Sequence, residues 1–283
     1  MELLLKEGRG LQTADYEDIS PDSDEVKAFL QSEEVRQLRS DKELFNYFFG
    51  ALAESEEAWT VYYDEPTRKI RYKYEEGLNL VSVLSEAVVE APLTHVLALF
   101  AEIDLFKHWF PNVTEASVLK EVTDYRGMYR CQQTMPWPIW PRDMVFSATG
   151  FLDRERLACL SVLKSLAEDE EYFGARAPQT TEGHVRLDIK RGYHYFQAVD
   201  SRRTRYVTIF NCDPQLACMP NWLMNFTMTK VCYQMLVLIQ EKALQVPDNE
   251  YGERIKQRKK LYGAEGEKSQ VVHQESAESG EEQ

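Results

Sequence analysis

The sequence lacks paired cysteines, a long apolar run and an excess of basic charge. Its five cysteines, Cys131, Cys159, Cys212, Cys218 and Cys232, are scattered, so we predict free thiols in a reducing compartment, with no disulfide framework and no zinc site. No stretch approaches the ~20 apolar residues that a membrane-spanning helix requires. The 283 residues include 33 Lys and Arg against 47 Asp and Glu, which argues against nucleic-acid binding because phosphate contacts need clustered basic side chains.

Motifs of common enzymes are also missing. The sequence has no GxSxG, no HExxH and no glycine-rich phosphate loop, and its histidines do not show the spacing of metal ligands. We therefore expect a protein that is not an enzyme, with no catalytic residues, no metal and no cofactor. The apolar run Leu3 to Leu5 is too short for a signal peptide, so we expect a cytoplasmic protein.

Hydrophobic residues make up 43% of the chain and aromatic residues 12%, enough for a packed core. Composition suggests three parts. Residues 1–40 are predicted to be an acidic extension with one short helix, 41–247 a folded domain, and 248–283 a charged, disordered tail. The acidic termini are candidate contacts for a protein partner.

The spacing of apolar residues predicts the elements of the folded domain. Leu44, Phe45 and Phe48 recur at helical spacing, which predicts a helix over 42–57 with Asp41 as its N-cap. A second helix follows Pro92, and a long, mostly apolar helix spans 220–245. Between the helices, residues alternate with a period of two in runs near 59–64, 70–75, 80–89, 115–122, 127–135, 144–152, 157–166, 185–199 and 205–212. One wet and one apolar face favour antiparallel pairing, so we predict an α+β fold with one large sheet of about nine strands.

Three segments, in this order, resemble the StAR-related lipid-transfer (START) domain. They are HWFPNVTEASVLKEV (108–122), YRCQQTMPWPIWPRDMVF (129–146) and DPQLACMPNWLMNFTMTKV (213–231). The resemblance covers residues 41–247. It implies the helix-grip fold of the Bet v 1-like superfamily, in which a curved antiparallel sheet wraps around a long C-terminal helix and that helix covers an internal apolar pocket for one lipid.

The chain departs from the family pattern at two positions. Sterol-binding members carry an arginine on the strand after the segment that resembles Pro141-Arg142-Asp143, where this chain has Ala148. Phosphatidylcholine-binding members carry an arginine near the end of the second helix, where this chain has Phe106 and Lys107. The ligand class therefore stays open among phospholipids, sterols and related lipids.

Several polar residues continue apolar strand faces and are candidate ligand contacts. A regular strand over 185–199 would point Arg191, Tyr193, Tyr195 and Gln197 inward, where a buried charge needs a partner such as a lipid phosphate. The alternative is a structural salt bridge, or a bulge that turns Arg191 outward. Another shared face, predicted either to contact ligand or to meet solvent, carries Arg130, Gln132 and Thr134. On the long helix, the candidates for lining the pocket, or for ordinary core packing, are Leu223, Phe226, Val231 and Leu238.

The proline-stiffened loop Met135–Pro141 carries Trp137, Ile139 and Trp140. Because tryptophan favours the membrane interface, we predict that these side chains contact a membrane during lipid exchange; the alternative is that they pack into the core. The basic residues of 254–260 either attract anionic lipid or form a solvated helix end.

Taken together, these features predict a protein that binds a single hydrophobic ligand and transfers it between membranes, with transient contact to a membrane surface. Two alternatives remain open: a lipid-sensing regulatory protein that recruits a partner, and a cavity enzyme of the polyketide-cyclase type.

Overall fold

The computed structural model describes residues 24–75, 80–213 and 221–262. The chain divides into two compact units, Met1–Leu52 and Ala53–Gln283. In the first unit, helix α2 (Asp24–Leu30) precedes helix α3 (Glu33–Leu52). The helix predicted over 42–57 corresponds to α3, which begins and ends earlier than predicted. The boundary predicted between residues 40 and 41, which separated the N-terminal extension from the folded domain, falls inside α3. Asp41 was interpreted as an N-cap, but the residues before it include strong helix formers, so the helix continues through that position.

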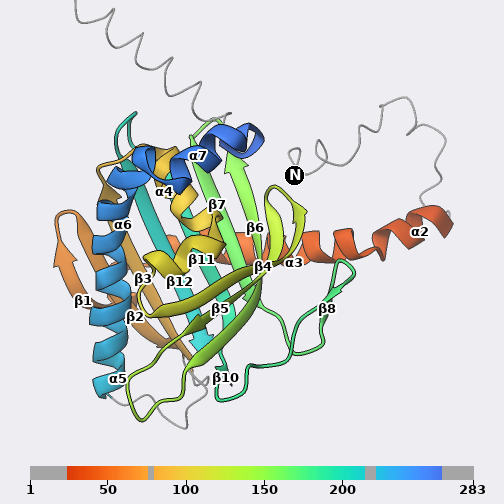
Figure 1. The fold of residues 1–283 in the computed structure, drawn as a ribbon, viewed down its shortest axis with the longest axis horizontal. Helices are drawn as coiled ribbons and strands as arrows, with labels where there is room; N and C mark the ends of the chain where they lie inside the picture. The colour runs from red at the N-terminus through yellow and green to blue at the C-terminus, as the bar shows by residue number, and fades with distance from the viewer. Residues whose placement is uncertain (1–23, 76–79, 214–220, 263–283) are drawn as a thin grey trace, which may run out of the picture. The chain divides into compact units, whose positions relative to one another are not determined.

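The second unit contains a sheet of nine antiparallel strands in the order β1-β2-β3-β12-β11-β7-β6-β5-β4, and an α+β fold is confirmed (Figure 1). A two-residue strand, β10 (Val185–Arg186), pairs in parallel with β6, and β8 (Glu171–Tyr172) pairs with β9 (Ala175–Arg176) in a separate hairpin. The nine strands are β1 (Thr60–Glu65), β2 (Arg68–Glu75), β3 (Leu80–Val89), β4 (Val113–Thr123), β5 (Arg126–Gln133), β6 (Arg142–Asp153), β7 (Ala158–Ser165), β11 (Asp188–Ala198) and β12 (Thr204–Asp213).

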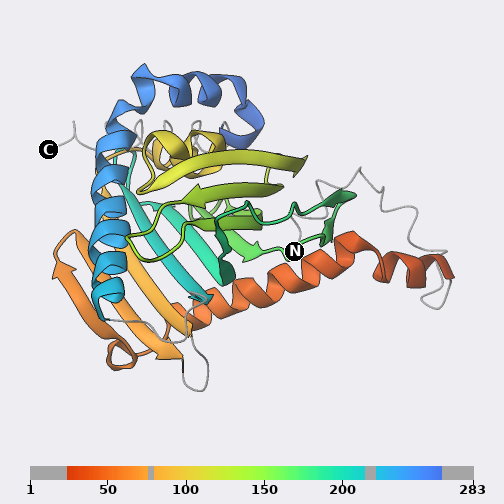
Figure 2. The same cartoon turned by 60° about the horizontal axis from the view of Figure 1, so that its bottom comes forward.

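Helices of the second unit pack on one face of this sheet. Between β3 and β4 lie α4 (Leu93–Ala101) and the 3₁₀ turn η3 (Ile103–His108); a shorter turn, η2 (Glu56–Ala58), precedes β1. After β12 come α5 (Asn221–Phe226), the π-helical segment η4 (Thr227–Tyr233) and α6 (Gln234–Gln245). These three follow one another as one helix along the sheet (Figure 2), at the place predicted for the long apolar helix.

The main core lies between the sheet and these helices. Val96 and Leu99 of α4 and Leu236 and Ile239 of α6 are fully buried together with Tyr206 of β12. Burying one such aliphatic side chain is worth about 1.5–3 kcal/mol. The packing of α6 against both α4 and β3 therefore holds the long helix on the sheet.

Part of the predicted disordered tail is folded. The turn η5 (Val246–Asp248) leads into α7 (Glu250–Gln257), whose Tyr251 is buried in the main core, as are Leu261 and Tyr262. The prediction of a tail from residue 248 is thus wrong up to residue 262, because the many charged residues obscured the few apolar positions that anchor this segment. Residues 1–23 and 263–283 lie outside the described residues, so the expected protein-partner contact at the acidic termini stays a prediction.

The thiols that the structure describes agree with the sequence analysis. Cys131, Cys159 and Cys232 form no disulfide, and burial raises the pKa of Cys131 to about 12. Cys218 lies outside the described residues, as does the side chain of Cys212. Within the described ranges, none of the helices is long and apolar enough to cross a membrane.

Gly252 allows α7 to approach the preceding turn, which yields a stability prediction. A Cβ atom at this position would lie 2.5 Å from the carbonyl oxygen of Val246 and 2.9 Å from that of Pro247. We expect Gly252→Ala to lower the free energy of unfolding by about 1–3 kcal/mol, because backbone must move to relieve the overlap. Urea unfolding measures this, with Gly50→Ala as control, since nothing lies within 4 Å of a Cβ built at Gly50. Equal stability of the two variants would show that the turn tolerates the methyl group.

Candidate functional site

Two adjoining cavities lie within the second unit. The larger, of about 490 Å³, is walled by α4, η3, β4 to β7, β11 and α7, and is called the polar lobe. The smaller, of about 210 Å³, lies under α5, η4 and α6 and is called the apolar lobe. Both are lined by Phe106, Phe146, Leu163 and His194, so these four side chains separate the lobes and join them.

Alternate residues of the strands form the wall of the apolar lobe. On β5 and the residues after it, Cys131, Gln133 and Met135 face this lobe, and Met144 and Phe146 follow on β6. The long helix covers it with Leu223 and Met235, among others. The strand period of two places every second side chain on the same face, which explains how short segments supply a continuous wall.

The polar side chains that line the apolar lobe include Arg142 and Gln133. Arg142 is buried, and desolvation lowers the pKa of its guanidinium from the usual value. Its Nη1 donates to the carbonyl oxygen of Trp140 at 2.6 Å. Gln133 donates through Nε2 to the carbonyl oxygen of Pro111 at 2.9 Å. The first contact ties the end of the Met135–Pro141 loop to the cavity wall, and the second joins the end of β5 to the residues before β4.

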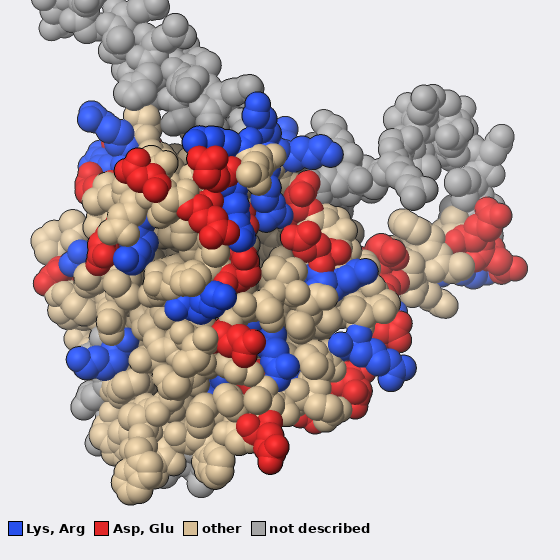
Figure 3. All heavy atoms as spheres, viewed as in Figure 1, with Lys and Arg blue, Asp and Glu red and all other residues tan. Residues whose placement is uncertain are grey.

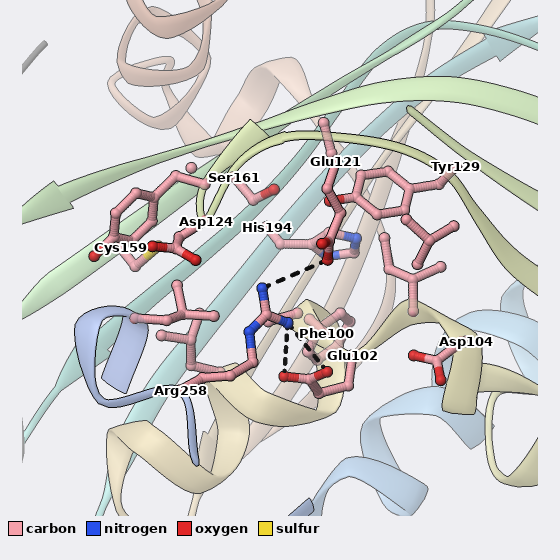
Figure 4. A pocket seen from close by; sticks show the side chains of 18 of the residues that line it. Phe100, Glu102, Asp104, Glu121, Asp124, Tyr129, Cys159, Ser161, His194 and Arg258 are labelled. Carbon is pink, nitrogen blue, oxygen red and sulfur yellow. Dashed lines mark hydrogen bonds and ion pairs between the residues drawn. The ribbon is translucent and has the colours of Figure 1, made fainter. Parts of the chain in front are cut away.

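The polar lobe is bordered by an ion-pair network centred on Glu102, which is only 3% exposed (Figure 4). Arg258 Nη1 lies 3.1 and 3.2 Å from the two carboxylate oxygens of Glu102, and Arg254 Nη1 lies 2.9 Å from Oε2. Tyr262 donates to Oε1 at 2.7 Å, while Arg254 binds Asp104 bidentately, both distances being 2.7 Å. A buried carboxylate is tolerated when it is paired and hydrogen-bonded, so this network fixes α7 at the end of α4.

His194 projects from β11 at the junction of the two lobes. Its ring is buried, its Nδ1 lies 2.8 Å from the hydroxyl oxygen of Tyr206, and burial lowers its pKa to about 3. The imidazole is therefore neutral at physiological pH. Phe100 packs on it with ring centroids 4.6 Å apart.

The structure separates the residues predicted on the long helix. Leu223 and Val231 line the apolar lobe, while Leu238 packs against the main core and Phe226 is half-buried. Neither Phe226 nor Leu238 lines either lobe, because the helix turns a different face to the cavity at those positions.

The residues predicted on β5 face away from both lobes. Tyr129, Cys131 and Gln133 line the cavities, which places the alternating residues Arg130, Gln132 and Thr134 on the opposite side. There Arg130 forms a bidentate pair with the fully buried Asp143, both distances being 2.9 Å, and Gln132 donates to Thr181 at 2.7 Å. Of the two alternatives for this face, the one away from the cavity is the one that the structure shows, and Arg130 forms a structural ion pair there.

A β-bulge explains why the expectation for β11 also fails. The register shifts between Ile189 and Arg191, so that Ile189 lines the apolar lobe but the next cavity-facing side chains are His194 and Phe196. Since an extra residue reverses the alternation, Arg191, Tyr193, Tyr195 and Gln197 lie on the other face and line neither lobe. The alternative of a bulge that turns Arg191 outward is the one that the structure shows.

Sequence reasoning missed Gln133, Arg142, His194 and the Glu102 network. For β5, a signal was present, because the face with Tyr129, Cys131 and Met135 is the more apolar of the two. For the Glu102 network no local signal exists, since its partners are more than 150 positions apart in the chain. No group of three or more His, Cys, Asp or Glu side chains in the described part of the chain could hold a metal ion.

The loop between β5 and β6 exposes its tryptophans. Trp137 is 91% exposed and Trp140 is 62% exposed, while Ile139 is half-buried, so the tryptophans do not pack into the core. The charged side chains on the face shown in Figure 3 gather mainly in its upper part, around α4 and α7. The lower part, over α5 and this loop, is largely uncharged.

Asp104 makes part of the stability depend on pH. Hydrogen bonding to Arg254 holds its pKa below the ordinary value of 3.8. A depressed pKa means that the stabilising contribution is fully present above about pH 4 and is lost as pH falls through the lower folded-state pKa. We expect Asp104→Asn to be less stable than the wild type at pH 7 and to lose less stability on acidification from pH 5 to pH 3.

Urea unfolding at a series of pH values measures this difference. Glu253→Gln serves as the control, because its ion pair with Lys256 is exposed on both sides and such pairs contribute little. An acid-induced loss of stability in Asp104→Asn that equals that of the wild type would contradict the assignment.

Comparison with known proteins shows the fold. Human StAR-related lipid transfer protein 5 superposes with a TM-score of 0.63 at 15% identity, over 75% of this chain and 98% of that chain. Human STARD10 matches with a TM-score of 0.60 at 14% identity, over 75% and 81%. A STAR-related lipid transfer protein fragment from Xanthomonas axonopodis matches with 0.54 at 21% identity, over 66% and 99%.

Sequence comparison adds no closer assignment, since no protein-family model matches the chain and no curated protein matches it. The strand order, the long C-terminal helix packed on the sheet and the superpositions agree with one another. The chain therefore has the helix-grip fold that these START domains show.

Proposed function

We propose that the chain binds a single hydrophobic ligand, a phospholipid, sterol or related lipid, in the two-lobed cavity and transfers it between membranes. The observation that carries this proposal is a cavity of about 490 Å³ adjoining an apolar lobe of about 210 Å³ in the interior of the second unit. Ligand pockets in proteins commonly have ~300–1,000 Å³. Each ligand CH₂ that leaves water contributes ~0.8 kcal/mol, so an apolar wall suffices for binding.

The long helix is the proposed lid. It supplies Leu223, Thr227, Val231 and Met235 to the apolar lobe, so its displacement would open that lobe. Its middle is π-helical (Thr227–Tyr233), and single π-helical turns occur frequently at functional sites. The proposed opening motion therefore centres on η4.

Membrane contact is proposed for the loop between β5 and β6. Met135 and Arg142, which flank this loop, both line the apolar lobe, so Trp137, Ile139 and Trp140 lie beside the proposed entrance. Trp222 at the start of α5 is partly exposed, and its neighbour Leu223 lines the same lobe. Exposed tryptophan is stable at the membrane interface, where its ring can be partly buried in lipid. We propose that the protein acts in the cytoplasm with transient membrane contact.

The similar solved structures support lipid transfer as the activity to test. Two of them are named lipid transfer proteins. At these identities the likeness itself concerns the fold, so the proposal depends on this chain's own cavity and loop.

Occupancy of the cavity can be tested by blocking it. Ala148 lines the polar lobe, and we expect Ala148→Phe to remove most of the bound lipid because the ring fills the space. Native mass spectrometry after incubation with mixed-lipid vesicles, followed by lipid extraction, measures the bound fraction. Ser147→Phe is the matched control, since it places the same side chain on the opposite face of β6. A wild-type protein that carries no lipid would contradict the proposed function.

The membrane contact can be tested with the two tryptophans. We expect the double variant Trp137→Ala, Trp140→Ala to bind vesicles about tenfold more weakly, which corresponds to ~1.4 kcal/mol of lost interfacial binding. Vesicle co-sedimentation measures binding, and a donor-to-acceptor vesicle assay measures transfer. Val199→Ala is the control, because Val199 is also exposed but follows β11 at the end of the sheet away from the β5–β6 loop. Unchanged binding by the folded double variant would sink the membrane assignment, and binding without transfer would favour a lipid sensor.

A further inference from the structure

His194 is the only polar residue among the four described side chains that line both lobes. The other three, Phe106, Phe146 and Leu163, are apolar. A ligand that extends from one lobe into the other must therefore pass the imidazole. Glu102, which lines the polar lobe, is already paired with Arg254 and Arg258. His194 lies on the opposite wall of this lobe, which the strands form (Figure 4).

The imidazole is held in a defined orientation. Its Nδ1 is joined to the Tyr206 hydroxyl at 2.8 Å, and His194 lies opposite Thr208 in the β11–β12 register. Phe100 and Phe210 pack around the ring with centroid distances of 4.6 and 5.3 Å. A side chain confined in this way presents its second ring nitrogen in a fixed direction, which is a requirement for selective binding.

The second ring nitrogen, Nε2, has no hydrogen-bond partner among the residues that the structure describes. A neutral imidazole carries one N–H donor and one bare nitrogen acceptor, and the contact with Tyr206 engages only Nδ1. A ligand in the cavity would cover Nε2, and covering a polar atom without giving it a partner is unfavourable. A ligand that satisfies Nε2 is therefore preferred over one that places a methylene there.

We propose that His194, oriented by Tyr206, binds a hydroxyl group carried within the apolar body of the ligand and thereby selects hydroxylated lipids. A hydroxyl can donate to a bare Nε2 or accept from a protonated one, so it suits both tautomers. A carbonyl or ether oxygen suits only the tautomer with Nε2–H. This inference depends on the proposed function, because it names the chemistry that the same cavity recognises.

Matched neutral probes test the inference. Methyl octadecanoate and its 9-, 10- and 12-hydroxy derivatives differ only in the hydroxyl group, and each can be titrated against the cavity-bound dye Nile red. We expect the wild type to bind at least one hydroxy ester about two- to tenfold more tightly than the parent ester, the range of a typical net hydrogen bond.

Variants locate the preference at one side chain. His194→Phe keeps a ring of similar size, so we expect it to bind the parent ester as the wild type does and to lose the preference for the hydroxy ester. His194→Gln, which retains a donor and an acceptor, should restore part of that preference. Tyr206→Phe removes the positioning contact, so it should reduce the preference for the hydroxy ester without weakening the binding of the parent ester. If Tyr206 had a merely structural role, the variant would bind both esters more weakly. Ser147→Ala, a polar change on the face of β6 that lines neither lobe, is the control that should keep the preference.

The outcomes separate the inference from the proposed function. A wild type that binds the esters without preferring any hydroxy isomer, or a His194→Phe variant that keeps the preference, overturns the role of His194 and leaves lipid binding intact. A wild type in which no ester displaces the dye overturns the proposed function together with the inference. If His194→Phe does not fold, the ratios measured for His194→Gln and Tyr206→Phe decide: preferences equal to that of the wild type in both overturn the inference.

Discussion

The apolar surface of the long C-terminal helix has to be removed from water, and the remaining architecture of the second unit depends on this burial. The sheet supplies the covering surface, since α6 packs against β3 and α4 with Leu236 and Ile239 fully buried. The helix is only partly in contact with the sheet along its length. Under α5 and η4, side chains of the strands and the helix enclose the apolar lobe. The same hydrophobic burial that stabilises the fold thus also defines the roof of the cavity.

The two ends of the cavity differ in physical character. Under the long helix the wall is apolar, which suits a hydrocarbon portion of a ligand. Beneath α7 the wall carries Glu102 and Asp104, which pair with Arg254 of α7, and Glu102 also pairs with Arg258 after its end. Buried ion pairs require close geometry to offset desolvation, so this network positions α7 more than it adds stability. His194 lies where these two environments meet, and aromatic rings surround it.

The alternation of strand residues was predictable, but the direction of each face was not. On β5 the sequence shows two alternating sets, and only packing decides which one faces the cavity; Arg130 pairs with Asp143 on the outer side. On β11 the residues read as one regular strand. A single bulge between Ile189 and Arg191 reverses the faces, so that Arg191 lies outward and His194 and Phe196 face the cavity. A bulge adds one residue without a clear sequence signal, so it escapes any argument from periodicity.

By itself, the sequence determined the element types, the nine-strand antiparallel sheet and the position of the long apolar helix, because each depends on local periodicity and on proline and polar breakers. Tertiary structure alone decided which polar residues meet the cavity, that residues 250–262 fold onto the domain, and that Glu102 pairs with Arg254 and Arg258. The physical reason is that these features arise from contacts between residues far apart in the chain, whose free energy is gained only when the sheet and helices have come together.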